Sequence, residues 1–300
     1  MTMEKLLFTG ASGFLGYNIC SILKDTYDVY TIGLNDENDF KCNLAEEVPL
    51  LNTRYDVVLH AAGKAHTVPK TEAERRAFYD INYQGTVNLC KAMENAGVPR
   101  AIVFVSTVAV YGCESGELIT EECPLRGTSS YAKSKIMAER YLTEWCAEND
   151  VVLGILRPSL IAGHKAPGNL GAMVEGIRKG LYMNIASGKV RKSVLMAVDI
   201  ARLLPLVEEK GGVYNVCDTY QPTLGELSAS VAQQMGRRKP ISLPYWTAWC
   251  LAKLGDLVGN WFPINSYKLE RMTNSLTFSN KKARMELGWE PLDVLENYKI

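Results

Sequence analysis

The sequence predicts an α/β protein of the Rossmann type, with a doubly wound parallel sheet and a smaller α/β C-terminal lobe that binds substrate. Three observations support this fold. Short apolar runs rich in β-branched residues alternate with longer helical patterns through the first two thirds of the chain. A glycine-rich turn joins the first run to the first helical pattern, and the alternation loosens after about residue 161.

The expected elements follow from these patterns in chain order. Six apolar runs are predicted to be strands: 5–9, 29–33, 57–61, 101–106, 152–157 and 213–216. Helical periodicity predicts helices at 14–24, 73–96, 131–149, 224–235 and 246–258. Six strands with intervening helices suit a sheet that is covered on both faces.

The same alternation suggests a division into two lobes. Residues 1–160, together with about 192–220, are expected to form the NAD(P)-binding Rossmann domain. Residues of about 161–191 and 221–300 are expected to form the substrate-binding lobe. No low-complexity linker separates them, so the lobes should share an interface.

Composition restricts the class of ligand and the compartment. The chain has 33 basic and 33 acidic residues among 300, so no global charge favours nucleic acid, and a small ligand is expected. Eight scattered cysteines show neither a C-x-x-C pair nor zinc-ligand spacing, so we expect reduced thiols and no metal site. The N-terminal residues run directly into the first strand without a secretory pattern, which favours a cytoplasmic protein.

An apolar stretch at 244–254 is too short to span a bilayer, and an amphipathic helix is expected there. Trp246 and Trp249 could rest on a membrane surface. We expect them to pack against the body of the protein instead.

The turn at 9–16 is the strongest candidate for a cofactor site. Its glycines allow the backbone to approach a pyrophosphate, which the free N–H groups and the positive end of the following helix would stabilise, and Gly16 allows tight packing of helix on sheet. The residues of this turn expected to bind the cofactor are Gly10, Ser12, Gly13, Phe14, Leu15 and Gly16.

Small or polar residues follow other expected strands at the same sheet edge. The adenine and the riboses of a dinucleotide would pass Asn43, Leu44, Ala61, Ala62 and Gly63. Asn82 is either a further cofactor contact or a polar anchor between buried helices.

The end of the second strand selects between NAD and NADP, because an acidic side chain there binds a ribose hydroxyl and a basic one a 2′-phosphate. Gly33 and Leu34 occupy the strand end, and Asp36 comes late. The pattern favours NAD and leaves NADP open.

Tyr131 and Lys135 are the candidate catalytic pair. A spacing of four residues puts both on one face of a helix, whereas Lys133 lies off this face and should be solvated. A lysine ammonium lowers the pKa of a nearby phenol, which lets tyrosine accept and return a proton. Thr107, at the end of the fourth expected strand, can hydrogen-bond the reacting oxygen, with Ser106 as the alternative; in isolation Thr107 would satisfy only its turn.

With these motifs the chain resembles an extended short-chain dehydrogenase/reductase of the NAD-dependent epimerase/dehydratase family. The T-G-x-x-G-x-x-G turn and the Y-x-x-x-K pair carry the resemblance, which spans nearly the whole chain. Further matches are the N-x-x-G-T pattern at Asn82, Val110-Tyr111-Gly112, Leu156-Arg157-Pro158, Val198-Asp199, Tyr214-Asn215-Val216 and Leu287-Gly288-Trp289 followed by Pro291.

This resemblance implies hydride transfer between nicotinamide C4 and a carbon of a nucleotide-linked sugar. Tyr131 would carry the hydroxyl proton, Lys135 would also hold the nicotinamide ribose, and Pro158 is carried over as a cofactor contact. A basic residue seven positions before the V-x-D aspartate commonly meets the substrate diphosphate in the family. Here that residue is Lys192, beside Arg191, where most relatives have arginine.

Departures from the family pattern narrow the reaction. The 4,6-dehydratases carry Asp-Glu after the catalytic threonine, but this chain has Val108-Ala109. Epimerisation beside a ketone needs an added acid/base pair, often a cysteine at position 108 with a histidine; that cysteine is missing, and His164 remains a lone histidine. Chemistry at a single carbon is left, most simply C4.

A 4-epimerase and a 4-ketoreductase both remain open. A looser similarity of the segment that contains Asn169 to reductases of UDP-4-keto sugars suggests a UDP-linked substrate and makes Asn169 a substrate candidate. The alternatives are an NADPH-dependent reductase of a small ketone or aldehyde and a non-catalytic dinucleotide sensor. Helices such as 73–96 and 131–149 pair two subunits in many relatives, so a homodimer is compatible with the resemblance.

Overall fold

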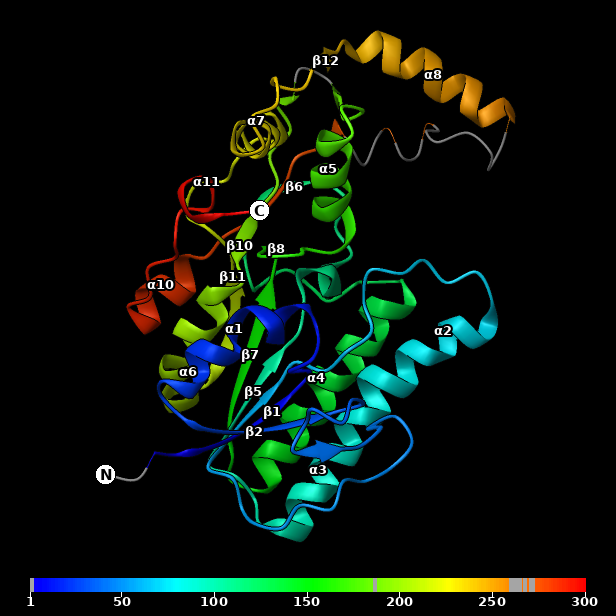
Figure 1. Ribbon diagram of the computed structural model, residues 1–300. Helices are drawn as coiled ribbons and strands as arrows, with labels where there is room; N and C mark the ends of the chain where they lie inside the picture. Colours follow the sequence, from blue (N-terminus) through cyan, green and yellow to red (C-terminus); the bar gives the residue numbers. More distant parts are fainter. Residues whose placement is uncertain (1–2, 186–187, 259–265, 267–268, 270–272) are drawn as a thin grey trace.

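The computed structural model describes residues 3–185, 188–258, 266, 269 and 273–300. Its centre is a seven-stranded parallel sheet in the order β11-β7-β5-β4-β1-β2-β3, flanked by helices, which confirms the Rossmann fold (Figure 1). The strands of this sheet are β1 (Lys5–Thr9), β2 (Asp28–Gly33), β3 (Phe40–Lys41), β4 (Val57–His60), β5 (Ala101–Val105), β7 (Val152–Pro158) and β11 (Gly212–Val216). The six expected strands are present, and the short β3 was missed.

Different helices cover the two faces of the sheet. Helices α1 (Phe14–Lys24) and α6 (Val198–Lys210) pack on one face, and α2 (Glu72–Tyr79), α3 (Gly85–Ala96) and α4 (Ser130–Glu148) lie on the other. The alternation of a strand explains this, because Leu6 and Phe8 of β1 join the first core while Leu7 joins the second. Both sides of β1 are apolar, as a strand buried on both faces requires.

The helix expected at 73–96 is interrupted. A π-helical turn, η1 (Asp80–Gln84), separates α2 from α3. The Thr86 hydroxyl of α3 donates to the Asn82 carbonyl of η1 at 2.7 Å, and the Asn82 side chain accepts from the Lys64 N–H outside the helix. Such a π turn aims one side chain away from the regular helical spacing, which periodicity alone does not indicate.

Parallel register brings the strand ends to one edge. Thr9 of β1 pairs with His60 of β4, His60 with Phe104 of β5, and Phe104 with Ile155 of β7. His60 is fully buried between Thr9 and the Thr86 hydroxyl, at 2.7 and 2.9 Å, and burial lowers its pKa to about 3. The turns that follow these strands therefore leave the sheet side by side.

A smaller group of elements follows β7 and forms the second lobe. Its core lies among α5 (Gly168–Arg178), α7 (Leu224–Gln234), α11 (Val294–Asn297), β8 (Leu160–Ala162) and β10 (Val194–Met196). Outside the central sheet the chain also forms short elements before and after β7: η2 (Val108–Tyr111), β6 (Gly116–Ile119), β9 (Asn184–Ile185), β12 (Ser242–Leu243), β13 (Leu276–Phe278) and α10 (Lys281–Leu287). Ala283 and Trp289 return to the first core, so the C-terminal stretch contributes to both lobes. The expected residue limits of the two domains stay a prediction.

Helix α8 (Tyr245–Val258) lies at the end of the second lobe farthest from the central sheet (Figure 1). The expectation that Trp246 and Trp249 pack against the body is wrong, because these side chains are 67% and 47% exposed. Ala248 and Ala252 make the contact instead. Within the described parts of the chain, no helix has the length and apolar character needed to cross a membrane.

Candidate active site

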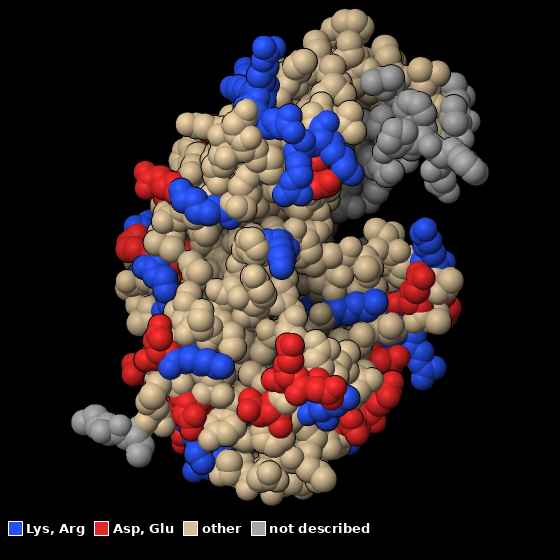
Figure 2. Space-filling model, in the orientation of Figure 1, with Lys and Arg blue, Asp and Glu red and all other residues tan. Residues whose placement is uncertain are grey.

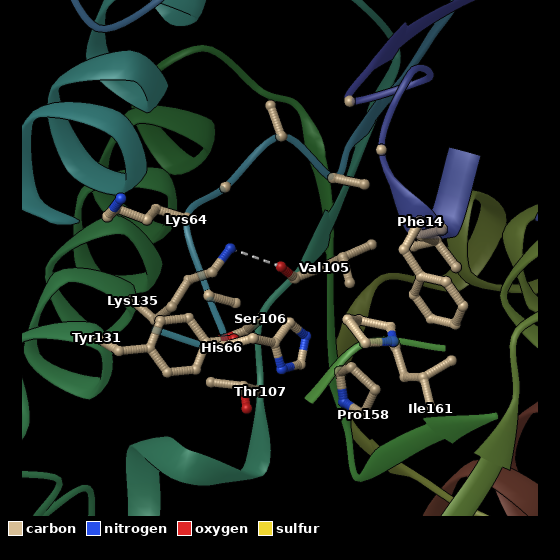
Figure 3. Close-up of a pocket in the computed structure, with 18 of the residues that line it drawn as sticks. Phe14, Lys64, His66, Val105, Ser106, Thr107, Tyr131, Lys135, Pro158 and Ile161 are labelled. Carbon is tan, nitrogen blue, oxygen red and sulfur yellow. Dashed lines mark hydrogen bonds between the residues drawn. The ribbon is translucent and has the colours of Figure 1, made fainter. Parts of the chain in front are cut away.

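A cavity of about 480 Å³ opens at the carboxyl edge of the central sheet. The turns after β1, β4, β5 and β7 and the first turns of α4 supply its walls (Figure 3). The lining residues are Gly10, Gly13, Phe14, Leu15, Ala61, Ala62, Gly63, Lys64, Ala65, His66, Val105, Ser106, Thr107, Tyr131, Lys135, Pro158, Ser159, Leu160, Ile161 and Pro167. Ligands bind in this position in doubly wound sheets.

The glycine turn forms one end of the cavity. Gly10 has φ +85°, and an added Cβ there would lie 2.7 Å from the Ala62 nitrogen. Gly13 precedes the first residue of α1 and provides no side-chain cap, so the first N–H groups of the helix remain available to an anion. A Cβ on Gly16 would lie 2.1 Å from the Ala11 carbonyl oxygen, which accounts for Gly16 by backbone packing. The chain thus presents the cradle that a dinucleotide pyrophosphate requires.

Lys135 of α4 lines the cavity (Figure 3). Its Nζ donates to the Val105 carbonyl at 2.8 Å and lies 4.4 Å from the centre of the Phe104 ring. The side chain is 3% exposed, and burial lowers the pKa of Lys135 to about 8, opposed by the charge of Glu139. Lys133 is exposed, as expected from its position off this helix face.

Tyr131 lies one turn before Lys135 on the cavity wall. Burial raises the pKa of Tyr131, and a side-chain hydrogen bond with Thr107 opposes that rise. The expected lowering by Lys135 is therefore wrong for the structure as described, because the lysine is directed to the Val105 carbonyl and burial of the phenol dominates. Tyr131 and Thr107 face the same space as expected (Figure 3).

The two adjacent hydroxyls after β5 differ in what they bind. Thr107 Oγ1 accepts from the Ala109 N–H at 3.2 Å, which caps the 3₁₀ turn η2. Its turn-capping role thus coexists with its place in the cavity. Ser106 is 3% exposed and donates its proton to Glu139. Because that proton is already committed, Thr107 is the better placed partner for a substrate oxygen.

A buried polar network supports this wall from below. Arg157 donates to Glu139 from Nε at 3.1 Å and from Nη2 at 2.6 Å, and from Nη1 to the Tyr111 hydroxyl at 3.0 Å. Tyr111 donates in turn to Asn215 Oδ1 at 2.6 Å. Glu139 follows Tyr131 and Lys135 on the same face of α4. Tyr111, Arg157 and Asn215 each belong to one of the family motif matches in the sequence. All three are therefore parts of one network that joins α4, β7 and β11.

Several residues expected to bind cofactor lie outside the cavity lining. Asn82 is 1% exposed, accepts from the Lys64 N–H at 2.7 Å and donates to the Lys64 carbonyl and to the Ser134 hydroxyl. It therefore holds the Gly63–Lys64 backbone from behind. Asn43 caps its own turn by accepting from the Ala45 N–H at 3.2 Å. Among the described residues, Ser12, Gly16, Asn43, Leu44 and Asn82 do not line this cavity.

The expected substrate residues are also set apart from it. Asn169 is exposed in the first turn of α5. Arg191 donates to the Gln221 carbonyl, and Lys192 Nζ donates to the Asn274 carbonyl at 2.9 Å. None of these three is in the cavity lining given above, whereas Thr107 is.

Three polar residues in the lining, Lys64, His66 and Ser159, were missed by the sequence interpretation. Lys64 and His66 follow β4 on the loop after Ala61-Ala62-Gly63. His66 has a left-handed backbone with φ 60°, and its Nδ1 is 3.0 Å from where a Cβ on Gly168 would lie. Burial lowers the pKa of His66. The sequence signal was its place three residues beyond the small-residue stretch, at an edge where ligands bind.

The chain is similar to a known family and to several known proteins. The family described as "NAD dependent epimerase/dehydratase family" matches residues 6–217. A curated UDP-glucose 4-epimerase from Vibrio cholerae is 26% identical, over 98% of this chain and 92% of that protein. An N-acetyl-alpha-D-glucosaminyl-diphospho-ditrans,octacis-undecaprenol 4-epimerase from Escherichia coli O157:H7 is 30% identical, over 93% and 88%.

A solved structure agrees in fold. The crystal structure of UDP-glucose 4-epimerase from Thermotoga maritima with UDP-glucose has a TM-score of 0.74 at 20% identity, over 98% of this chain and 96% of that one. The family match over most of the central sheet, with the glycine cradle and the Tyr131–Lys135 pair on one cavity, leads to one conclusion. This chain belongs to the NAD-dependent epimerase/dehydratase family of enzymes.

Proposed function

We propose that the protein catalyses reversible epimerisation at C4 of a hexose carried on a diphosphate, with UDP-hexose as the first candidate substrate. The observation that carries the proposal is the convergence of Thr107, Tyr131 and Lys135 on the cavity that also contains the glycine cradle. The residues after Thr107 are Val108 and Ala109, which offer no acid or base for chemistry at a second carbon.

NAD held in the cradle would accept hydride from C4 and return it. Tyr131 takes the O4 proton as the hydride leaves, and it returns that proton when hydride is restored to the opposite face. Thr107 hydrogen-bonds the same oxygen. Lys135 lies one helical turn from Tyr131, and the pKa of Tyr131, which burial raises in the structure as described, must fall before the phenol can act as a base.

The diphosphate of the substrate is the chemistry shared by two carriers. One is a nucleoside diphosphate, as in the UDP-glucose 4-epimerase of Vibrio cholerae. The other is a polyprenyl diphosphate, which the name of the 30% identical Escherichia coli relative specifies. Arg191 and Lys192 are our candidates for diphosphate contacts from the second lobe, and to serve in this way both would exchange a backbone carbonyl for the substrate.

A stereochemical assay tests the proposal. The enzyme is supplied with catalytic NAD and UDP-glucose or UDP-N-acetylglucosamine labelled with deuterium at C4, and NMR follows the product. Interconversion to the C4 epimer with retained deuterium supports an epimerase, because the hydride returns to the sugar it left. Washing out of the label or absence of an epimer contradicts it for the nucleotide carrier. The same assay with a short polyprenyl diphosphate-linked N-acetylglucosamine tests the second carrier.

The reductase alternative predicts a different stoichiometry. With a UDP-4-keto-6-deoxy sugar, a 4-ketoreductase oxidises one NADH or NADPH for each sugar reduced, whereas a 4-epimerase with its hexose consumes none. If no diphosphate-linked sugar reacts and UDP leaves the melting temperature unchanged, reduction of a small ketone replaces the proposal.

A further inference from the structure

Helix α8 packs on the body through its small residues and exposes its large ones. Ala248, Ala252 and Gly255 form the buried stripe, and Ala248 and Ala252 cluster with the buried Leu269, against which the partly buried Ile185 also packs. Trp246 and Trp249 point outward, at 67% and 47% exposed. Burial of aromatic rings supplies most of the apolar stabilisation a helix can gain, so this orientation is the reverse of the one expected for a helix that packs only on its own protein.

Other apolar side chains extend the exposed face. The strand β12 pairs with β9, and the Asn184 N–H donates to the Ile241 carbonyl at 2.9 Å. This pairing places the exposed Ile241 beside Met183, which is also exposed. We define the α8 surface by its exposed apolar residues: Leu181, Met183, Ile241, Tyr245, Trp246, Trp249 and Leu254.

Basic residues adjoin this surface. Arg237, Arg238 and Lys239 lie before β12 and are separated from it by two residues, and all three are exposed. None of them takes part in an ion pair with another described residue. Figure 2 shows basic side chains grouped on the second lobe, whereas the opposite end of the molecule mixes both signs.

The excess of positive charge is local. Residues 236–258 contain four basic residues and one acidic residue, although the whole chain is balanced. The acidic residue is Asp256, which is bound by the Ser266 N–H and hydroxyl and lies 3.7 Å from Lys253. Lys253 Nζ in turn lies 5.7 Å from the centre of the Trp249 ring. The α8 surface thus exposes indole rings, and the adjoining Arg237, Arg238 and Lys239 form no ion pair with another described residue.

We propose that the α8 surface binds an anionic lipid bilayer. Indole rings favour the boundary between headgroups and acyl chains, and lysine and arginine beside them are attracted to anionic headgroups. Such a helix lies in the plane of the interface with its aromatic face inserted to a depth of roughly 5–10 Å. The charge complementarity selects a bilayer over a second copy of this chain, since two copies would bring the same cations together.

The proposal is independent of the reaction. The α8 surface shares no residue with the cavity lining, so substitutions on one leave the residues of the other in place. If the substrate proves to be linked to a polyprenyl diphosphate, the α8 surface brings the enzyme to the bilayer that contains the substrate. If the substrate is soluble, the surface still locates the enzyme at the membrane.

Flotation of the full-length protein with vesicles tests the proposal. We expect binding to vesicles of equal parts phosphatidylglycerol and phosphatidylcholine, and much weaker binding to phosphatidylcholine alone. Trp246→Ala/Trp249→Ala and, separately, Arg237→Gln/Arg238→Gln/Lys239→Gln should each reduce binding to the anionic vesicles about tenfold or more. Lys24→Gln/Lys91→Gln/Arg140→Gln, which removes three exposed cations from the other lobe, should leave binding unchanged.

Tryptophan fluorescence adds a readout of depth. Brominated lipids should quench wild-type emission and quench the Trp246→Ala/Trp249→Ala variant less, because the variant loses two exposed indoles; of the tryptophans it keeps, Trp145 and Trp289 are buried and Trp261 lies outside the described residues. Binding without a preference for anionic lipid, or equal binding by the tryptophan variant, would overturn the proposal. So would a concentration-dependent dimer that Trp246→Ala/Trp249→Ala abolishes, combined with failure to float. Epimerase assays on soluble substrate report separately on the proposed function.

Discussion

In the half that carries the central sheet, polar side chains of α4 and of the strand ends bind one another beneath the cavity, as Glu139 of α4 and Arg157 of β7 do. In the second lobe, Arg191 and Lys192 instead bind backbone carbonyls, and the exposed Arg237 forms no ion pair with another residue that the structure describes. The first arrangement fixes the positions of groups before a ligand arrives. The second leaves cations that a ligand or a surface can recruit. The expected effects of substitution differ accordingly.

The largest effect is expected from the buried ion pair. Glu139→Gln leaves the Arg157 guanidinium buried without its counter-charge, and the free energy of unfolding should fall by about 3–5 kcal/mol. Urea denaturation measures the loss. Glu290→Gln is the matched control, because the Arg284–Glu290 pair has similar geometry but is exposed, and its removal should have no measurable effect. Similar losses in both variants would remove the distinction between the halves.

Gly13→Val should abolish dinucleotide binding. Even a single Cβ there would lie 3.2 Å from the Gly10 carbonyl oxygen, and the branched side chain would fill the cradle. Calorimetry with NAD should show at least a tenfold rise in Kd, which corresponds to about 1.4 kcal/mol. Gly236→Ala is the control, since it strains a left-handed backbone with φ +62° but lies outside the cavity lining and has no neighbour within 4 Å, so the Kd should stay unchanged. Wild-type affinity in a folded Gly13→Val protein would place the cofactor elsewhere.

The joint variant Arg191→Ala/Lys192→Ala tests whether the second lobe contributes to the site. If these cations bind the substrate diphosphate, KM should rise about tenfold while kcat changes less. Steady-state kinetics on the reactive substrate from the stereochemical assay measure both constants. A lowered melting temperature with unchanged KM would assign the two residues to folding alone, through their bonds to the Gln221 and Asn274 carbonyls.

A smaller effect is expected at His66, which lies where the two lobes meet. Asparagine tolerates the left-handed backbone, so His66→Asn removes the imidazole with little strain. Loss of one hydrogen bond to substrate should lower kcat/KM by roughly threefold to tenfold. His164→Asn, at an exposed histidine stacked on Tyr17, should leave kcat/KM unchanged. Equal values for both variants would remove His66 from the site.

Sequence patterns predicted the central sheet and the pair Tyr131 and Lys135, because both depend on residues that are close together in the sequence. Apolar alternation predicted the strands that meet at the cavity, and a spacing of four residues placed Tyr131 and Lys135 on one face of α4. The protonation of Tyr131 could not be predicted in this way, since burial by distant segments sets its pKa. The π turn that turns Asn82 toward Lys64 was likewise invisible to a regular helical period.

The second lobe was harder to predict, because contacts between residues that are distant in the sequence determine its structure. Counting back from Asp199 found Lys192 but not the Asn274 carbonyl that binds it, because that contact joins distant parts of the chain. The pattern also predicted that Trp246 and Trp249 would be buried. Periodicity identifies an apolar face, but it does not indicate whether the fold brings anything to cover that face.

The central claim is that Tyr131 carries the proton in chemistry at one sugar carbon. Tyr131→Phe keeps the ring and removes the hydroxyl, and Tyr141→Phe makes the same change on the same helix outside the cavity lining. With NAD binding measured alongside turnover, the account predicts that Tyr131→Phe binds NAD normally and loses about a hundredfold or more in kcat, while Tyr141→Phe retains its activity. A Tyr131→Phe enzyme that keeps more than half of the wild-type kcat would contradict it.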